Sequence, residues 1–150
     1  MKIIEKEELM KIIPHKGKMF LLDRIIDWNV EKGKISSETK IDENFMFYEE
    51  SVSGVLPYVL FEMSAQTIAA LLAIANDENE KNSKMGFLLS VSNMKFSKTV
   101  INCGSCVVIN ATQDSDVGDV YSFVADFLVN GEMFGSGKFT VLASDVKQGH

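Results

Sequence analysis

Hydrophobic residues fill one long stretch near the middle of the chain, residues 57–75, PYVLFEMSAQTIAALLAIA. Its one charged residue is Glu62, and Ala, Leu, Met and Gln favour a helix. Pro57 suits the first turn, where its missing N–H is not needed, and the polar run from Asn76 marks the exit. A helix that is apolar on nearly all sides is either buried or spans a membrane. Because Glu62 and Gln66 argue against lipid, we predict a buried helix that a sheet wraps.

Shorter patterns precede this helix. Residues 3–12 carry apolar positions with charges between them, which predicts a short amphipathic helix. Residues 19–28 are apolar with scattered charges and indicate a long strand. Residues 34–41 alternate like a half-buried strand. The aromatic and acidic residues 42–54 lack a clean period, which is typical of a loop pressed against an apolar surface.

Four further strands are predicted after the helix. They cover residues 86–96, 107–112, 120–129 and 133–142. Asn130-Gly131 lies between the last two and is a strong two-residue hairpin signal. The terminal residues after 142 are polar.

This order of elements predicts an α+β fold in which one helix lies in the concave face of a curled antiparallel sheet. A single helix leaves a face and an edge of such a sheet uncovered. A dimer that extends the sheet across the subunits would protect them.

The bulk composition sets limits on the class of protein. The 150 residues suffice for one domain, residues 1–150, with a sizeable core. The 15 basic and 21 acidic residues give a net charge of −6, which argues against a broad nucleic-acid surface. The first residues contain acids throughout and lack a long apolar run, so we expect neither a signal peptide nor a membrane anchor. A cytoplasmic location is the simplest expectation.

The two cysteines form the motif Cys103-Gly-Ser-Cys106. A zinc site would need further ligands, but the chain has no second cysteine pair and its histidines are His15 and His150. The motif falls between two predicted strands, so we expect two inert thiols in a loop. We therefore expect neither a metal nor a cofactor.

Glu62 is the residue of the central helix that most needs an explanation. Burial of a carboxylate costs several kcal/mol unless it is paired or protonated. Gln66 lies one helical turn further along the same face and is placed to orient it. Two interpretations stay open: an acid–base residue in a buried site, or a core glutamate bonded to a neighbouring strand.

Several motifs resemble the 3-hydroxyacyl-acyl-carrier-protein dehydratases. Residues 13–16 (IPHK) followed by 19–24 (MFLLDR) are similar to the opening of that family. Residues 60–66 (LFEMSAQ) are similar to its central helix, which carries the catalytic carboxylate. Residues 86–89 (GFLL) with 94–96 (MKF) look like the next strand. Within that family, the motifs of this chain are most like those of the dehydratases of aryl-polyene and flexirubin pathways.

The resemblance implies a hot-dog fold, a homodimer and an acyl thioester carried on phosphopantetheine. It assigns Glu62 to catalysis and implies sites at the dimer interface, where the partner supplies a histidine. The matching segment here, residues 44–53, contains no histidine, and Tyr48 or Phe45 takes its position. The glycine amide that polarises the thioester carbonyl in the family aligns with Gly54 or with Pro57, which has no N–H.

Dehydration must remove a proton from the carbon beside the carbonyl and protonate the leaving hydroxyl. Which residue acts as the base is therefore an open question. Tyr48 would serve only with a depressed pKa, and Glu49 and Glu50 are typical solvated loop acids. His15 aligns with a position that looks structural. Glu62 acting alone, or an inactive site, are the remaining alternatives.

Other residues are candidates for substrate contacts. With Gly54, they are the aromatics and strand residues of a predicted acyl tunnel: Phe45, Phe47, Tyr58, Gly86 and Phe87. An acyl carrier protein is the expected partner, and the lysines that could meet it are Lys81, Lys84, Lys95 and Lys98. The first hypothesis is a dehydratase. The alternatives are a dehydratase-like subunit that pairs with a complete dehydratase, and a hot-dog acyl thioesterase.

Overall fold

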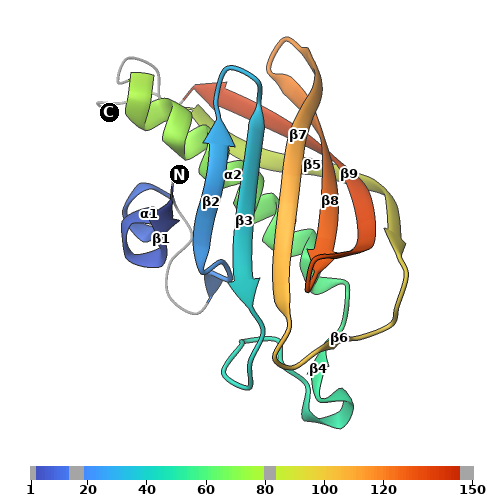
Figure 1. Cartoon of the computed structure of the whole chain (residues 1–150). Coiled ribbons are helices and arrows are strands. Elements are labelled where there is room, and N and C mark those ends of the chain that lie inside the picture. The colour runs from blue at the N-terminus through green and yellow to red at the C-terminus, as the bar shows by residue number, and fades with distance from the viewer. Residues whose placement is uncertain (1–2, 14–18, 80–83, 146–150) are drawn as a thin grey trace.

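A seven-stranded antiparallel sheet forms most of the molecule (Figure 1). The computed structural model describes residues 3–13, 19–79 and 84–145, and for residues 77–79, 84–87 and 144–145 it describes the backbone alone. The sheet order is β1-β2-β3-β7-β8-β9-β5. In chain order these strands are β1 (Ile4–Glu5), β2 (Arg24–Asn29), β3 (Lys34–Lys40), β5 (Lys84–Phe96), β7 (Cys106–Val117), β8 (Val120–Val129) and β9 (Glu132–Asp145).

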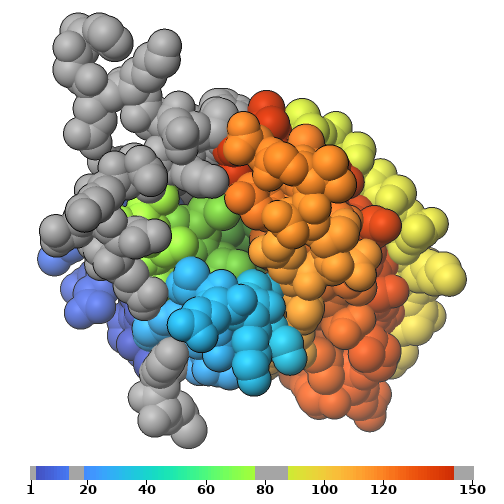
Figure 2. All heavy atoms as spheres, turned by 90° about the horizontal axis from the view of Figure 1, so that it is seen from above, coloured from blue at the N-terminus to red at the C-terminus, as the bar shows by residue number. Residues whose placement is uncertain are grey.

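Helix α2 (Val59–Asn79) lies in the concave face of this sheet. Seen from above, its green side chains lie between the strands β2 and β3 on one side and the hairpin of β7 and β8 on the other (Figure 2). The strands bury every second residue against it, as Ile35, Ser37 and Thr39 do on β3. The α+β fold predicted from the sequence is thus confirmed.

The apolar composition of α2 matches its place in the core. Residues 59–76 are long and apolar enough to cross a membrane by composition, but most of this segment is buried against the sheet. Fully buried residues include Leu60, Met63 and Ile68. Burial of each such side chain contributes about 1.5–3 kcal/mol.

The boundaries of α2 differ from the predicted residues 57–75. Pro57 and Tyr58 form a turn just before the helix, in which the Val59 N–H donates to the Leu56 carbonyl at 3.2 Å. The helix also continues to Asn79, through the polar residues that the sequence suggested as its end. The change to polar residues marks where the helix stops being buried, but the helical backbone continues beyond it.

The N-terminal predictions need two corrections. Helix α1 covers only Lys6–Ile12, because Ile4–Glu5 pair with β2 as strand β1. The strand predicted over residues 19–28 starts only at Arg24. Residues 19–22 run over α2 instead, where their backbone bonds to the side chain of Gln66 rather than to a strand.

Three short elements join the main ones. A 3-10 turn, Glu50–Val52, leads into β4 (Gly54–Val55), which pairs with β6 (Ile101–Asn102). The two strands approach so closely at Gly54 that an added Cβ would lie 2.2 Å from the Ile101 carbonyl oxygen. This close approach requires glycine.

The hairpin between β8 and β9 confirms its sequence signal. Asn130 and Gly131 have φ angles of 53° and 81°, as the favoured two-residue hairpin turn requires. Strand β5 lies at the end of the sheet order and pairs only with β9 among the described residues.

Candidate active site

One face of α2 is not covered by the described part of the chain, and Glu62 lies on it. Glu62, Ala65, Ala69 and Leu72 are half-buried, and Phe61 is 41% exposed. These positions repeat at three to four residues and therefore share one side of the helix. Glu62 is therefore half-buried rather than buried as expected for this helix, because the sheet wraps the other sides of α2.

The side chain of Gln66 forms hydrogen bonds with Glu62 and with the backbone of residues 19–21. Its side chain is 0% exposed. Its Nε2 donates to the Glu62 Oε1 at 3.1 Å and to the Met19 carbonyl at 2.7 Å. Its Oε1 accepts the Leu21 N–H at 2.9 Å. The carboxylate is thus oriented by a fixed amide, as the helical spacing predicted.

Tyr48 lies in the loop that precedes β4. Desolvation raises the pKa of its phenol, and the nearby Cys103, Glu43 and Glu50 raise it further, against a hydrogen bond with Ser53 that lowers it. A phenol with a raised pKa keeps its proton near neutrality, so the condition under which Tyr48 would be a base is not met. Tyr48 is placed to donate a hydrogen bond rather than to accept a proton.

The backbone amides near the helix start differ in their availability. The Gly54 N–H donates to the Glu49 carbonyl at 3.3 Å, so Gly54 has a packing role in this structure. Pro57 has no N–H. The amides of Val59 and Leu60 are bonded within the first turn. Among the described residues, no hydrogen-bond partner is found for the Tyr58 N–H, which lies just before α2.

The aromatic residues predicted to line a tunnel occupy two environments. Phe45 and Phe47 are half-buried, pack against the core and have ring centroids 6.5 Å apart. Tyr58 is 56% exposed just before α2. Gly86 and Phe87 are described by their backbone, which pairs with Ala143 and Leu142 in β9. Their substrate roles stay predictions.

The remaining candidates lie elsewhere or are not described. His15 and Lys81 fall outside the described residues, as does the side chain of Lys84. Lys95 and Lys98 are exposed near the end of β5.

Both cysteines are free thiols. Burial raises the pKa of Cys106, which also bonds to Glu38, whereas Cys103 is exposed and lies near Tyr48. Within the described ranges, no group of three or more His, Cys, Asp or Glu residues is placed to hold a metal.

The sequence reasoning missed the part played by residues 19–21 in the site. Their apolar character suggested a strand, yet their backbone satisfies the buried amide of Gln66. The available signal was Gln66 itself, because a buried side-chain amide must find partners for both its oxygen and its nitrogen.

The family and the sequence relatives that match this chain are dehydratases. The ApeP-like family, described as ApeP dehydratase, matches residues 7–149. A 3-hydroxyacyl-[acyl-carrier-protein] dehydratase FabZ of Rickettsia bellii is 31% identical over 148 residues, covering 95% of this chain and 97% of the relative. The FabZ of Rickettsia felis is 29% identical over 144 residues, covering 95% and 98%.

Solved structures show the same fold. The dehydratase heterocomplex ApeI:P from Xenorhabdus doucetiae matches with a TM-score of 0.81 at 16% identity, over 93% of this chain and 91% of that one. The thioesterase HI1161 from Haemophilus influenzae matches with a TM-score of 0.71 at 12% identity, over 99% and 97%. The fold is therefore the hot-dog fold, and the chain belongs to the ApeP-like dehydratase family.

Proposed function

We propose that this protein removes water from a 3-hydroxyacyl thioester to give a trans-2-enoyl thioester, with Glu62 as the acid–base residue. The observation that carries the proposal is the orientation of the half-buried Glu62 by the buried Gln66 amide, on the face of α2 that the described residues leave uncovered. An acid–base residue needs a defined orientation and access to substrate, and Glu62 combines both.

The reaction asks for two proton transfers and for stabilisation of an enolate-like oxygen. Glu62 returns to the leaving hydroxyl the proton that it takes from the carbon beside the carbonyl. A single carboxylate carries both transfers in this scheme, because Tyr48 keeps its proton.

The thioester oxygen needs hydrogen-bond donors. We propose the Tyr58 N–H at the start of α2 and the Tyr48 phenol as these donors. The positive end of the helix dipole adds to the amide at this position. Phe45, Phe47, Gly86 and Phe87 remain proposed acyl contacts.

The proposed substrate is carried by an acyl carrier protein, as in the name of the FabZ relatives. We propose a homodimer in which strand β5 continues the sheet into a second copy. Leu89 on β5 is 54% exposed, and the outer edge of this strand has no neighbour among the described residues. A cytoplasmic location and a single domain over residues 1–150 stay predictions.

A second candidate function is that of a dehydratase-like subunit of a heterocomplex. The similar ApeI:P structure is a dehydratase heterocomplex. The absence of a histidine in residues 44–53 fits a chain whose partner supplies the missing group. An acyl thioesterase is the weakest alternative, because the family and the FabZ relatives are dehydratases.

The test is to incubate the purified protein with 3-hydroxyacyl and trans-2-enoyl thioesters and to follow the mass of both. The proposal expects interconversion by one water, lost in Glu62→Gln, which keeps the side chain's size. No turnover alone, with turnover restored by a co-expressed second dehydratase, would favour the heterocomplex and contradict the self-sufficient enzyme.

A further inference from the structure

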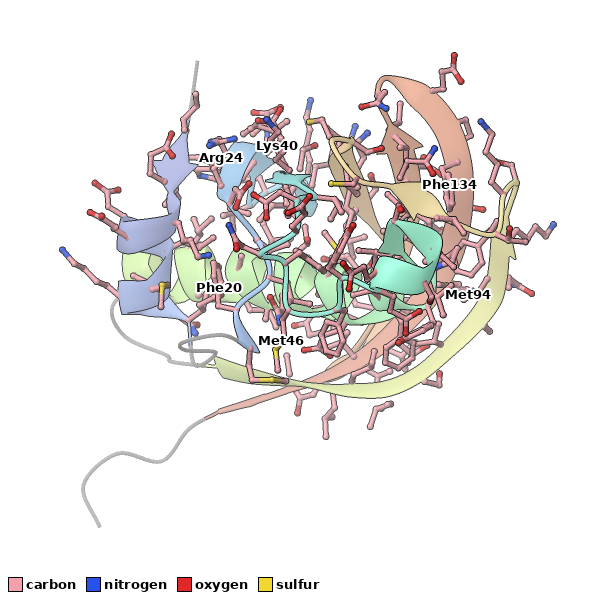
Figure 3. All side chains as sticks on the ribbon, turned by 90° about the horizontal axis from the view of Figure 1, so that it is seen from below. Phe20, Arg24, Lys40, Met46, Met94 and Phe134 are labelled. Atoms are coloured by element: carbon pink, nitrogen blue, oxygen red, sulfur yellow. The ribbon has the colours of Figure 1, made fainter. Side chains whose placement is uncertain are left out.

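The loop that leads from β3 to α2 contains a serine in an unfavourable backbone conformation. Ser53 follows the 3-10 turn Glu50–Val52 and has φ 49° and ψ 45°, which is the left-handed region. This region favours glycine, so a serine in it raises the energy of the backbone. Figure 3 looks at the molecule from below, with this loop in front of α2 and its Met46 labelled. A side chain at such a position calls for a contact that compensates the strain.

Backbone hydrogen bonds hold Ser53 in this conformation from both sides. Its N–H donates to the Glu50 carbonyl at 3.1 Å, and its carbonyl accepts the Cys103 N–H at 3.0 Å. The next residue, Gly54, exchanges two backbone hydrogen bonds with Glu49. All of these bonds use the main chain, so a glycine in place of Ser53 would preserve them. They do not account for the serine hydroxyl.

The hydroxyl of Ser53 forms a hydrogen bond with the phenol of Tyr48. Desolvation raises the pKa of Tyr48, with further increases from Cys103, Glu43 and Glu50, whereas the bond to Ser53 lowers it. A bond that lowers the pKa of a phenol stabilises the phenolate, which can only accept a hydrogen bond. Ser53 is therefore the donor and the phenol oxygen is the acceptor. The phenol keeps its own O–H for another acceptor.

We propose that Ser53 is a positioning residue for the dehydration, because its hydroxyl donates to the phenol oxygen of Tyr48 and turns the Tyr48 O–H toward the thioester oxygen. A hydroxyl that accepts a hydrogen bond is polarised and becomes a stronger donor. A donor oriented in advance stabilises a developing enolate oxygen without reorganisation during the reaction. This inference rests on the proposed function, in which Tyr48 is one of the two donors to that oxygen.

The first experiment replaces Ser53 by glycine, which adopts the left-handed conformation without steric cost but has no hydroxyl. We expect kcat to fall about three- to tenfold, the effect of one neutral hydrogen bond, while KM changes little. The urea midpoint should stay close to the wild-type value, because the backbone bonds are kept. The matched control is Ser51→Gly, at an exposed serine of the same loop, and it should keep the wild-type kcat. An unchanged kcat in Ser53→Gly would overturn the proposal.

A double-mutant cycle with Tyr48→Phe separates a positioning role from a structural one. The phenylalanine has no hydroxyl for Ser53 to orient, so Ser53→Gly should lower kcat no further in the Tyr48→Phe protein. A structural serine would act whether or not the phenol is present. An equal fall in kcat in both backgrounds, or a fall that accompanies a lowered urea midpoint, would therefore count against the positioning role.

A measurement without turnover separates this inference from the proposed function. Protein labelled with carbon-13 at the tyrosine Cζ contains three labelled side chains, and Tyr48→Phe identifies the NMR signal of Tyr48. The pKa of Tyr48 should rise in Ser53→Gly, which lacks the donor, and stay unchanged in Ser51→Gly. Addition of the trans-2-butenoyl thioester of N-acetylcysteamine should move the Tyr48 signal in wild type and move it less in Ser53→Gly.

These two NMR results support the positioning role of Ser53 even where no dehydration is found. A Tyr48 pKa that is the same in wild type and Ser53→Gly contradicts the hydrogen bond. An equal movement of the Tyr48 signal by the thioester in both proteins contradicts the orientation of the phenol toward the substrate.

Discussion

Replacement of Gln66 by leucine should weaken the fold and the site together. Leucine is close to glutamine in size, though somewhat larger, and provides neither donor nor acceptor. The Leu21 N–H loses its bond of 2.9 Å in a buried position, and the Met19 carbonyl loses its bond of 2.7 Å in a partly buried one. Glu62 also loses the amide that orients its carboxylate.

The magnitude follows from the burial of these groups. A buried N–H left without a partner costs about 1–3 kcal/mol, and a partly buried carbonyl that can bind water costs less. We therefore expect Gln66→Leu to lower the free energy of unfolding by about 2–3 kcal/mol. For a chain of this size that corresponds to a fall in Tm of about 4–12 °C.

The variant Gln66→Glu separates lost shape from lost hydrogen bonding. An introduced carboxyl at this buried position, beside the Met19 carbonyl and Glu62, has a pKa above its unfolded value of about 4.3. The native state then binds more protons than the unfolded state, so stability falls as pH rises through that window. Protonated at low pH, the new side chain can again donate to the Met19 carbonyl.

Urea denaturation of wild type, Gln66→Leu and Gln66→Glu at pH 5 and pH 7.5 measures these effects. The deficit of Gln66→Glu should be larger at pH 7.5 than at pH 5, while that of Gln66→Leu should change little. A Gln66→Leu protein as stable as wild type, or a Gln66→Glu deficit that grows toward acid, would refute the reasoning.

Three further predictions concern other parts of the structure. Gly54→Ala should lower the free energy of unfolding by about 1–3 kcal/mol in urea denaturation, because its Cβ would collide with the Ile101 carbonyl, and an unchanged midpoint would contradict this. Iodoacetamide should alkylate Cys103 before Cys106 in peptide mass mapping, since burial raises the pKa of Cys106 and lowers its thiolate fraction. Alkylation of Cys106 first would contradict this prediction. Tyr48→Phe should leave the shape of the pH profile of activity unchanged below about pH 10, because the raised pKa of the phenol keeps Tyr48 protonated there. A pH profile whose rise toward higher pH is shifted in Tyr48→Phe would show that Tyr48 acts as a base.

The sequence predicted the elements whose patterns are local. Strand β8 matches its predicted residues 120–129, and the Asn130-Gly131 turn was readable because it depends on two residues with positive φ. The long helix was also predictable, since a buried apolar run of that length has few alternatives.

The predictions that were wrong concern features that depend on contacts between residues distant in the sequence. Residues 19–22 look like a strand, but bonds to Gln66, 45 and 47 positions away, hold them on the helix. The exposure of Glu62 depends on which side of α2 the sheet leaves open. The use of the Gly54 amide by Glu49 is a matter of loop geometry that the residue types do not specify.

Isotope labelling tests the central claim most directly. Purified protein is incubated with a trans-2-enoyl thioester in water enriched in oxygen-18, and the masses of the products are measured by mass spectrometry. We expect oxygen-18 in the 3-hydroxyl of an intact thioester, and none with Glu62→Gln. Oxygen-18 only in a free carboxylic acid, or label in the hydroxyl that persists in Glu62→Gln, would contradict it.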